Sequence, residues 1–410
     1  MRTIPLSLQH LFAMFGATVL VPFLFHVNPA TSLLFNGIGT LIYLVVCKGR
    51  IPAYLGSSFA FIAPVFAVIA VPGLGGYSAA QGGFIAFGLF FILISQIVRF
   101  AGTRWIGVLF PPAALGAIVA VIGLELAPVA VEMAGLTGKP FADPRITHAV
   151  GVFVSIFTLL VIIMCSVCFR GFLAIIPILM GVLAGYVIAL ILGIVDLSMV
   201  STAPWLELPR FCMPTFNQSA ILMIMPAAFV VLAEHIGHLV VTGNIVGRDL
   251  VTDPGLHRSL LGDGISNVLS GFVGATPNTT YGENIGVMAI TKVYSVWVIG
   301  GAAVIAILAS FVGKLAALIR SIPVPVMGGI CILLFGVIAV AGVRMLIEQR
   351  VDYTQPRNLI LTSVVLTAGV SGALVKVGSV ELKGMALGTA VAIVLSLTFG
   401  LIDRFRNSPS

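Results

Sequence analysis

Long apolar runs alternate with short polar or basic segments from one end of the chain to the other. A helix needs roughly 20 predominantly apolar residues to cross the hydrocarbon core of a bilayer, and most of the runs approach that length. The pattern predicts fourteen membrane segments, at residues 5–25, 29–47, 52–71, 79–101, 107–126, 146–169, 171–195, 219–242, 257–275, 277–291, 293–314, 321–343, 356–375 and 380–402. We therefore expect an all-α membrane protein that crosses the bilayer many times.

Two of these segments are interrupted by residues that form helices poorly. The third contains Gly56-Ser-Ser-Phe59, and the tenth contains Thr276-Pro-Asn-Thr-Thr-Tyr-Gly-Glu283. Non-helical backbone survives at membrane depth only where it is paired inside protein or lines a cavity. We expect residues 57–61 and 278–281 to pair as two short antiparallel strands. The half-helices that follow would then direct their free N–H groups toward the midplane.

Three motifs occur twice in the same order, which indicates an internal repeat. Leu8-Gln9-His10 resembles Ala233-Glu234-His235, and Asn36-Gly-Ile-Gly39 resembles Asp263-Gly-Ile-Ser266. The spacing of Pro112, Gly116 and Gly123 recurs at Pro325, Gly329 and Gly336. Two halves of seven segments each must enter the membrane from opposite sides. This predicts a 7+7 inverted repeat, the plan of many secondary transporters, with interrupted segments 3 and 10 as partners.

Composition places most of the chain in lipid. Hydrophobic residues make up 59% of the sequence and charged residues 9%, against about a quarter in soluble domains. The net charge of +7 does not indicate nucleic acid binding, because the basic residues are dispersed singly between apolar runs. If the N-terminus is cytoplasmic, 14 of the 21 Lys and Arg residues fall on the cytoplasmic side, so both termini are expected there. Arg2 precedes the first apolar run without a cleavage site, and we expect that segment to stay in the membrane.

No motif in the chain indicates an enzyme, a metal site or a cofactor. The five cysteines are odd in number and lie mostly in apolar runs, so they do not form a disulfide framework. Cys165 and Cys168 form a CxxC pair without a second ligand pair nearby, which favours packed thiols. Nucleotide-binding and zinc-protease motifs are absent from the sequence. An ion gradient is therefore the expected source of energy.

Glu234 lies in the middle of the eighth segment. Burying a charge at such a depth costs roughly 2.5–3.5 kcal/mol, so a carboxylate there is a functional candidate. His238 follows one helical turn later on the same face, and a Glu–His pair can take up and release a proton. The alternative is a buried polar pair that only fixes helix packing.

Glu283 lies at the break in the tenth segment, after Tyr281 and Gly282. Because Gly282 has no side chain, a ligand could approach the backbone closely there. We expect Tyr281, Gly282 and Glu283 to contact a substrate. The alternative for Glu283 is a capping role, since a carboxylate is favourable at the start of a helix.

Several other polar or aromatic residues fall inside predicted segments. Phe59, in the third segment, could stack on a planar ligand or serve only in packing. Asp263, in the ninth, could tether moving parts or take part in proton transfer. Helix packing is as good an explanation as ligand contact for Gln9 and His10, and His235 faces away from the Glu234–His238 side. Glu125 lies near a segment end and is expected to be interfacial.

The stretch Glu283-Asn-Ile-Gly-Val-Met-Ala-Ile-Thr-Lys292 resembles the signature of the nucleobase–ascorbate transporter family, an acidic residue or Gln followed by Asn-x-Gly-x4-Thr-Arg/Lys. Gln9-His10 is similar to a second motif of that family. Residues 4–22 and 276–286 look very like those of its bacterial uracil carriers. The resemblance extends over essentially the whole chain.

The resemblance implies a uracil–proton symporter of the bacterial cytoplasmic (inner) membrane, without a cofactor and forming a homodimer. It implies a core domain, residues 1–101 and 219–314, and a gate domain, residues 102–196 and 321–402. In such carriers the residues matching Glu234 and Glu283 bind the pyrimidine ring at the midplane, with contacts from Phe59 and Gly282. The residue matching His238 pairs with that matching Glu234. Phe335 departs from the tyrosine expected in segment 12 and removes a hydroxyl group near the gate.

Other transport functions remain open. A xanthine or uric acid carrier could use the same scaffold. An anion carrier would favour a positive binding centre over two glutamates. A membrane enzyme would need a nucleophile or metal cluster, and a channel would not need titratable groups at a helix break.

Overall fold

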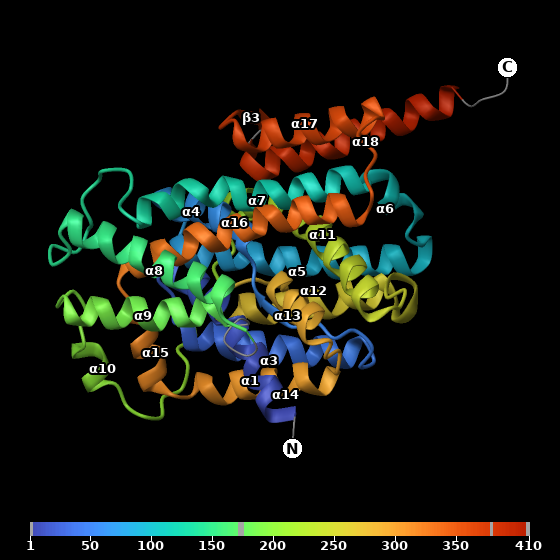
Figure 1. Ribbon diagram of the computed structural model, residues 1–410. Helices are drawn as coiled ribbons and strands as arrows, with labels where there is room; N and C mark the ends of the chain where they lie inside the picture. The colour runs from blue at the N-terminus through green and yellow to red at the C-terminus, as the bar shows by residue number, and fades with distance from the viewer. Residues whose placement is uncertain (1–2, 171–175, 378–379, 407–410) are drawn as a thin grey trace.

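The protein is described by a computed structural model that covers residues 3–170, 176–377 and 380–406 (Figure 1). The first half contains α1 (Thr3–Ala13), α2 (Phe15–Leu24), α3 (Pro29–Val46), β1 (Leu55–Ser57), η1 (Phe59–Phe61), α4 (Ile62–Ala70), α5 (Gly76–Ala101), α6 (Arg104–Leu109), α7 (Pro112–Met133), α8 (His148–Cys168), α9 (Pro177–Ile191) and α10 (Ser198–Thr202). The second half contains α11 (Gln218–Val246), η3 (Val251–Gly255), α12 (Leu256–Val273), β2 (Asn278–Thr280), α13 (Gly282–Thr291), α14 (Val296–Ser310), α15 (Gly313–Arg320), α16 (Val324–Glu348), α17 (Pro356–Val370), β3 (Leu374–Val377), β4 (Val380–Lys383) and α18 (Gly384–Arg406).

Helices dominate, as the apolar pattern predicts for a multi-pass membrane protein. Within the described residues, eight helices are long and apolar enough to cross a membrane: residues 4–24 and helices α3, α5, α7, α8, α11, α16 and α18. Four shorter apolar helices span 59–70, 177–191, 296–310 and 356–370. α12 belongs to neither group because its polar face is turned inward, with Ser259, Asp263 and Asn267 fully buried. The fourteen-segment count therefore stays a prediction.

Helices that are far apart in sequence lie side by side. α7 packs along α16, α5 along α12, and α3 along both α12 and α14, while α17 and α18 cover the outer side of α7 (Figure 1). The buried apolar side chains form one continuous core between these helices. Each half of the chain is thus packed mainly against the other half.

Small residues let α5 and α12 approach closely. A Cβ atom on Gly88 would lie 2.7 Å from the carbonyl oxygen of Gly264 and from the amide nitrogen of Val268. A Cβ atom on Gly264 would lie 2.8 Å from the carbonyl oxygen of Gly88. In membranes, where lipid replaces water, such backbone contact is a main source of helix association.

Replacing Gly88 with alanine is expected to destabilise the protein by about 1–3 kcal/mol, the usual cost of overpacking a tight interface. The effect is measured as a lower melting temperature of the purified protein in detergent. Gly336→Ala is the matched control, because no heavy atom lies within 4 Å of the Cβ position at Gly336. Equal melting temperatures for the two variants would contradict the role assigned to this contact.

The two interrupted segments meet through the predicted antiparallel strands. β1 and β2 pair with Leu55 opposite Thr280 and Ser57 opposite Asn278. The amide of Ser58 donates to the carbonyl oxygen of Pro277 at 2.8 Å, and extends the pairing by one bond. The predicted strand over residues 57–61 is wrong beyond Ser57, because Phe59–Phe61 forms a 3-10 turn that leads into α4. Both strands are fully buried, as non-helical backbone at membrane depth requires.

Several predicted boundaries differ from the structure, and three of them have a clear physical reason. The segment predicted at 107–126 begins instead at Pro112, since consecutive prolines end one helix and start the next. The segment predicted at 356–375 ends at Val370, and an antiparallel pair of valine-containing strands, β3 and β4, follows it. The segment predicted at 171–195 is helical from Pro177 to Ile191, and residues 171–175 lie outside the described part of the chain.

Candidate functional site

Glu234 and Glu283 come from two elements that meet beside the strand pair. Asn217 caps α11 by accepting hydrogen bonds from the amides of Ser219 at 2.9 Å and Ala220 at 3.2 Å. Glu234 lies in the middle of this 29-residue helix. α13 begins directly after β2 and carries Glu283 in its first turn, where the helix dipole favours a carboxylate. α11 and α13 are in contact, so the structure brings the two predicted glutamates together.

Accessibility distinguishes these residues from their surroundings. Glu234, Gly282 and Glu283 are partly accessible, whereas the adjacent Ala233 and Asn284 are fully buried. The Oε2 atom of Glu234 is buried without a hydrogen-bond partner among the described residues. An unpaired buried acceptor is costly, so a ligand N–H group that reached it would restore a lost hydrogen bond.

His238 lies beside the site but does not form the predicted pair with Glu234. Its Nδ1 atom is 3.1 Å from the hydroxyl oxygen of Thr280, at the end of β2. A Cβ atom on Gly282 would lie 3.3 Å from its Nε2 atom. The spacing along α11 predicts that both side chains share one face of the helix. In the structure His238 bonds Thr280 in β2 and not Glu234, one turn away in its own helix. A side chain at position 282 would press against the imidazole.

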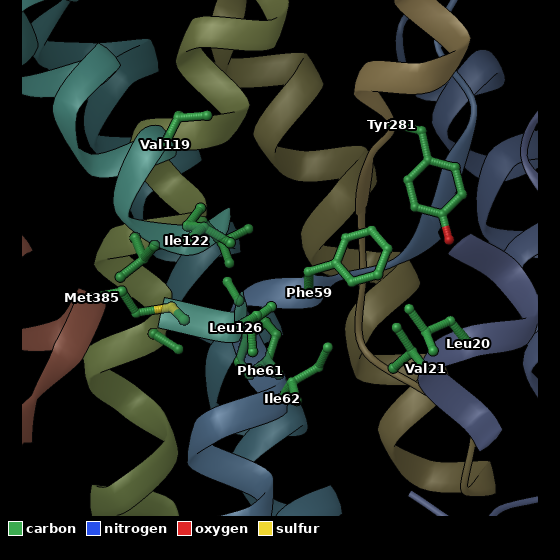
Figure 2. Packing of buried hydrophobic residues seen from close by; sticks show 14 of the residues in the cluster. Leu20, Val21, Phe59, Phe61, Ile62, Val119, Ile122, Leu126, Tyr281 and Met385 are labelled. Atoms are coloured by element: carbon green, nitrogen blue, oxygen red, sulfur yellow. The ribbon is translucent and has the colours of Figure 1, made fainter. Parts of the chain in front are cut away.

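Phe59 lies between the strand pair and α7. Figure 2 shows its ring between Tyr281 and the side chains Val119, Ile122 and Leu126. The ring is 6% exposed and meets the ring of Phe335 edge-on, with centroids 6.0 Å apart and planes at 81°. Phe335 therefore makes an aromatic contact at the position where a tyrosine was expected.

Tyr281 packs against the other interrupted segment. Its side chain is 3% exposed, and a Cβ atom on Gly56 in β1 would lie 2.6 Å from its hydroxyl oxygen. Its amide donates to the carbonyl oxygen of Tyr54 at 3.1 Å. The side chain is thus engaged in packing against the other strand segment. The contact of Tyr281 with a substrate stays a prediction.

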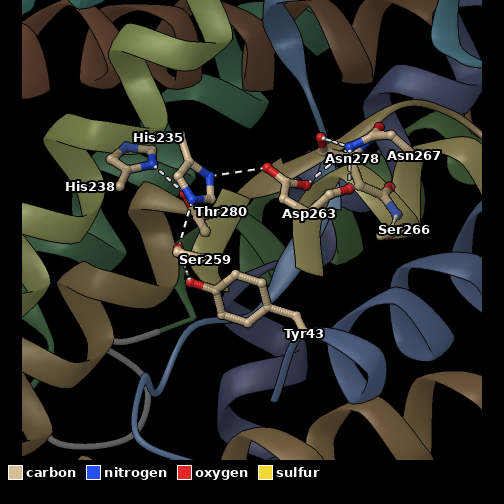
Figure 3. Close-up of polar contacts among 9 residues, drawn as sticks. All are labelled: Tyr43, His235, His238, Ser259, Asp263, Ser266, Asn267, Asn278 and Thr280. Carbon is tan, nitrogen blue, oxygen red and sulfur yellow. Dashed lines mark hydrogen bonds and ion pairs between the residues drawn. The ribbon is translucent and has the colours of Figure 1, made fainter. Parts of the chain in front are cut away.

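Away from the two glutamates, a series of buried, hydrogen-bonded side chains runs from α3 through α12 and α11 to β2 (Figure 3). The hydroxyl of Tyr43 lies 2.6 Å from that of Ser259, which lies 2.7 Å from Nε2 of His235. The Nδ1 atom of His235 is 3.0 Å from Oδ2 of Asp263, and both side chains are fully buried.

The chain continues to the strand. The amide group of Asn267 donates to Oδ1 of Asp263 at 3.0 Å and to the carbonyl oxygen of Asn278 at 3.0 Å. The backbone amide of Asn278 donates back to Oδ1 of Asn267 at 2.6 Å. Asp263 therefore ties α12 to α11 and, through Asn267, to the strand that precedes Glu283.

Sequence reasoning missed the partner of Asp263. It placed His235 on a different face from Glu234 but assigned it no contact. The available signal was the depth of Asp263, because a carboxylate inside a membrane segment needs a partner and only His235 and His238 occur nearby in α11. Which histidine takes this part depends on the rotation of α11 against α12, and a single sequence does not contain that rotation.

We expect His235→Phe to destabilise the protein by about 1–3 kcal/mol, because it leaves the carboxyl group of Asp263 buried without its partner. The loss is measured as a lower melting temperature in detergent. His148→Phe, at an exposed histidine, is the control. In a double-mutant cycle with Asp263→Asn, the two losses should not add. Additive losses would argue against coupling between the two side chains.

Of the remaining polar candidates, His10 and Glu125 have hydrogen-bond partners in the structure. The Nδ1 atom of His10 lies 2.7 Å from the side-chain nitrogen Nδ2 of Asn284, and this contact connects α1 to α13. Gln9 is 7% exposed. Glu125 is partly accessible and accepts a hydrogen bond at 2.7 Å from the amide of Met385, at the start of α18. No group of three or more potential metal ligands occurs within the described ranges.

Apolar helices of spanning length, two helix breaks joined by a buried strand pair and carboxylates beside the breaks define a multi-pass membrane transport protein. The Permease family model matches residues 1–378. The uracil permease of Escherichia coli (strain K12) is 63% identical over 406 residues, 99% of this chain and 93% of that protein. The uracil permease of Paenibacillus larvae subsp. larvae is 61% identical over 99% of this chain and 96% of its own.

A more distant relative, the uracil permease of Bacillus subtilis (strain 168), is 49% identical over 95% of this chain and 91% of its own. The chain belongs to the nucleobase–ascorbate transporter family, as the motif at residues 283–292 indicates. Members of this family are permeases, so the prediction of a transporter and not an enzyme is confirmed.

Solved structures of transporters share the fold at low sequence identity. The transmembrane domain of the cyanobacterial bicarbonate transporter BicA aligns with a TM-score of 0.60 at 15% identity, over 95% of this chain and 97% of that one. Murine Slc26a9, an anion transporter, aligns with a TM-score of 0.67 at 11% identity, over 98% of this chain and 68% of that one. At this level of identity the likeness concerns the arrangement of the helices only.

Proposed function

We propose that this protein is a proton-coupled carrier that imports uracil across the bacterial cytoplasmic membrane. The observation that carries the proposal is the meeting of Glu234 and Glu283 beside a helix break, with an acceptor atom of Glu234 unpaired. The high identity to several proteins named uracil permease supports the choice of substrate.

The chemistry of uracil matches these groups. The ring is neutral and planar, with two N–H donors and two carbonyl acceptors. Glu234 and Glu283 would accept from the N–H groups, and the free amides at the start of α13 would donate to a carbonyl oxygen. We propose Phe59 and the backbone at Gly282 as further contacts at the bilayer midplane. Tyr281 would contribute its backbone only.

Proton coupling is proposed for the same carboxyl groups. Glu234 directly precedes His235, whose side chain contacts Asp263, and its helix contacts the helix that carries Glu283. One proton bound in this set would relieve repulsion between the negative charges. The Nδ1 atom of His238 bonds Thr280, and its Nε2 atom lies near Gly282, so His238 would respond to a substrate bound there. Asp263 would influence the titration through its contact with His235. Protons that arrive with uracil would then leave on the cytoplasmic side.

We further propose the fourteen-segment, 7+7 inverted plan with core (1–101, 219–314) and gate (102–196, 321–402) domains. Packing pairs that occur twice support it. α5 on α12 corresponds to α14 on α3, and α1 on α14 corresponds to α11 on α5. In the gate, α7 on α17 corresponds to α16 on α8, and α8 on α9 corresponds to α17 on α18. An inverted repeat requires such duplicate pairs.

Orientation and assembly complete the proposal. Both termini would lie in the cytoplasm, which the two-to-one bias of Lys and Arg residues supports. A homodimer would form through helices of the gate, and large apolar side chains exposed on α17 and α18, such as Leu359 and Val394, offer a surface for it. Cross-linking of single-cysteine variants at these two positions tests this arrangement.

Uptake by proteoliposomes with an imposed pH gradient tests the function. Labelled uracil should accumulate only when the outside is more acidic, and excess unlabelled uracil should compete. Xanthine and uric acid are included because a carrier for them could use the same scaffold. Competition by xanthine at lower concentration than by uracil would reassign the substrate, and accumulation independent of the gradient would remove proton coupling. Counterflow of labelled uracil distinguishes a carrier from a channel.

A further inference from the structure

An apolar cavity separate from the carboxylate site lies between α1, α2, α3, α14 and α15. Its volume is about 230 Å³, and every residue that lines it is apolar except Thr18. Leu8 and Phe12 line it from α1, Leu33 from α3, and Ile305 and Ala309 from α14. The composition of this wall fits a hydrocarbon chain and offers almost nothing to a polar solute.

A second cavity, of about 220 Å³, adjoins the first at the ends of α2 and α15. The two cavities share Pro29 and Ile319 in their walls. The second is lined by His26 and Arg320, whose side chains are exposed. None of the ion pairs in the described part of the chain includes Arg320, so its charge is available to an external anion.

The position of this opening matches the surface of a membrane. His26 lies two residues after the end of α2, and Arg320 ends α15, the short helix that connects α14 to α16. α15 contacts α10 at one end of the helix bundle (Figure 1). At the other end of α15, Lys314 lies 5.9 Å from the centre of the Trp205 ring. Tryptophan and basic residues gather where headgroups meet water, and the apolar cavity extends from that level along membrane helices.

We propose that the two cavities form one binding site for an anionic phospholipid. An acyl chain would occupy the apolar part between α1, α3 and α14, and the phosphate would bind Arg320, whose planar guanidinium suits phosphate oxygens. A fatty acyl chain alone would leave Arg320 unpaired, and inorganic phosphate would leave the apolar part empty. The bound lipid would stabilise the packing of α15 against α2, α3 and α14.

Native mass spectrometry of the purified protein tests the site. Phosphatidylglycerol and phosphatidylethanolamine with identical acyl chains are added to separate samples, with inorganic phosphate as a third. The protein should retain phosphatidylglycerol about fivefold more strongly, the preference expected from one arginine near an anionic headgroup. Inorganic phosphate should not bind measurably.

Variants identify the parts of the site. Arg320→Gln should remove the preference, and Arg320→Lys should keep most of it. Arg248→Gln, at another exposed arginine without an ion pair, should change nothing. Ala309→Phe, which fills the apolar part, should reduce retention of both lipids. An unchanged melting temperature in detergent shows that each variant is folded.

Equal retention of the two lipids by the unchanged protein would overturn the proposal. So would an unchanged preference in Arg320→Gln, or an unchanged total retention in Ala309→Phe. These outcomes do not depend on the substrate or the coupling ion, because lipid retention is measured without transport.

Discussion

Replacing Glu283 with glutamine is expected to abolish measurable uracil binding. Glutamine has nearly the same shape, but it loses the negative charge and presents an N–H group where the carboxylate accepts. A hydrogen bond to a charged group contributes about 1.5–3 kcal/mol, so the loss of one such bond lowers affinity by about ten- to a hundredfold. The new N–H group, which would face an N–H group of uracil, lowers it further. Isothermal titration of the purified protein with uracil measures the effect.

Glu132→Gln is the matched control for this variant. Glu132 is exposed and forms an ion pair with Lys139 at 2.8 Å on the surface, so its replacement should leave uracil affinity unchanged. The melting temperature of Glu283→Gln should show that the protein is folded. Retained wild-type affinity in a folded Glu283→Gln protein would exclude Glu283 as the main ligand of uracil.

Replacing Glu234 with alanine is expected to eliminate uptake driven by a pH gradient. The change removes the unpaired acceptor and one member of the set of interacting carboxyl groups, so neither the substrate contact nor the shared proton is retained. Uptake of labelled uracil into proteoliposomes should fall to the level of empty vesicles. Glu234→Gln keeps the volume of the side chain and should fail equally, since it can neither accept at both oxygens nor titrate.

The control for Glu234 is His10→Gln, which changes a buried polar residue on α1 and keeps a hydrogen-bonding group facing Asn284. We expect it to retain part of the uptake. Gradient-driven accumulation by Glu234→Ala at the wild-type rate would remove Glu234 from the mechanism and leave Glu283 and Asp263 as the titrating groups.

Much of the fold follows from the one-dimensional pattern, because lipid imposes a strong constraint on each segment. Every predicted segment contains at least one helix, and the two interrupted segments contain the paired strands β1 and β2. Helix ends were predicted least well where local chemistry intervenes, as at the proline pair before α7 and at the strands β3 and β4. The mean hydropathy of α12 is low, because the polar side chains that this helix carries face the protein interior.

The sequence by itself determined that the protein lies in a membrane, that two segments break, and that Glu234 and Glu283 carry an unusual burial cost. These conclusions depend on residue type and spacing, which are local properties. Only the tertiary structure decided the partners. His238 bonds Thr280 and not Glu234, His235 and not His238 meets Asp263, and Tyr281 turns into the packing of β1. Each outcome depends on how far α11, α12 and β2 are rotated and shifted against one another. That relation arises from the packing of α11 and α12 against α3 and α5, in the first half of the chain.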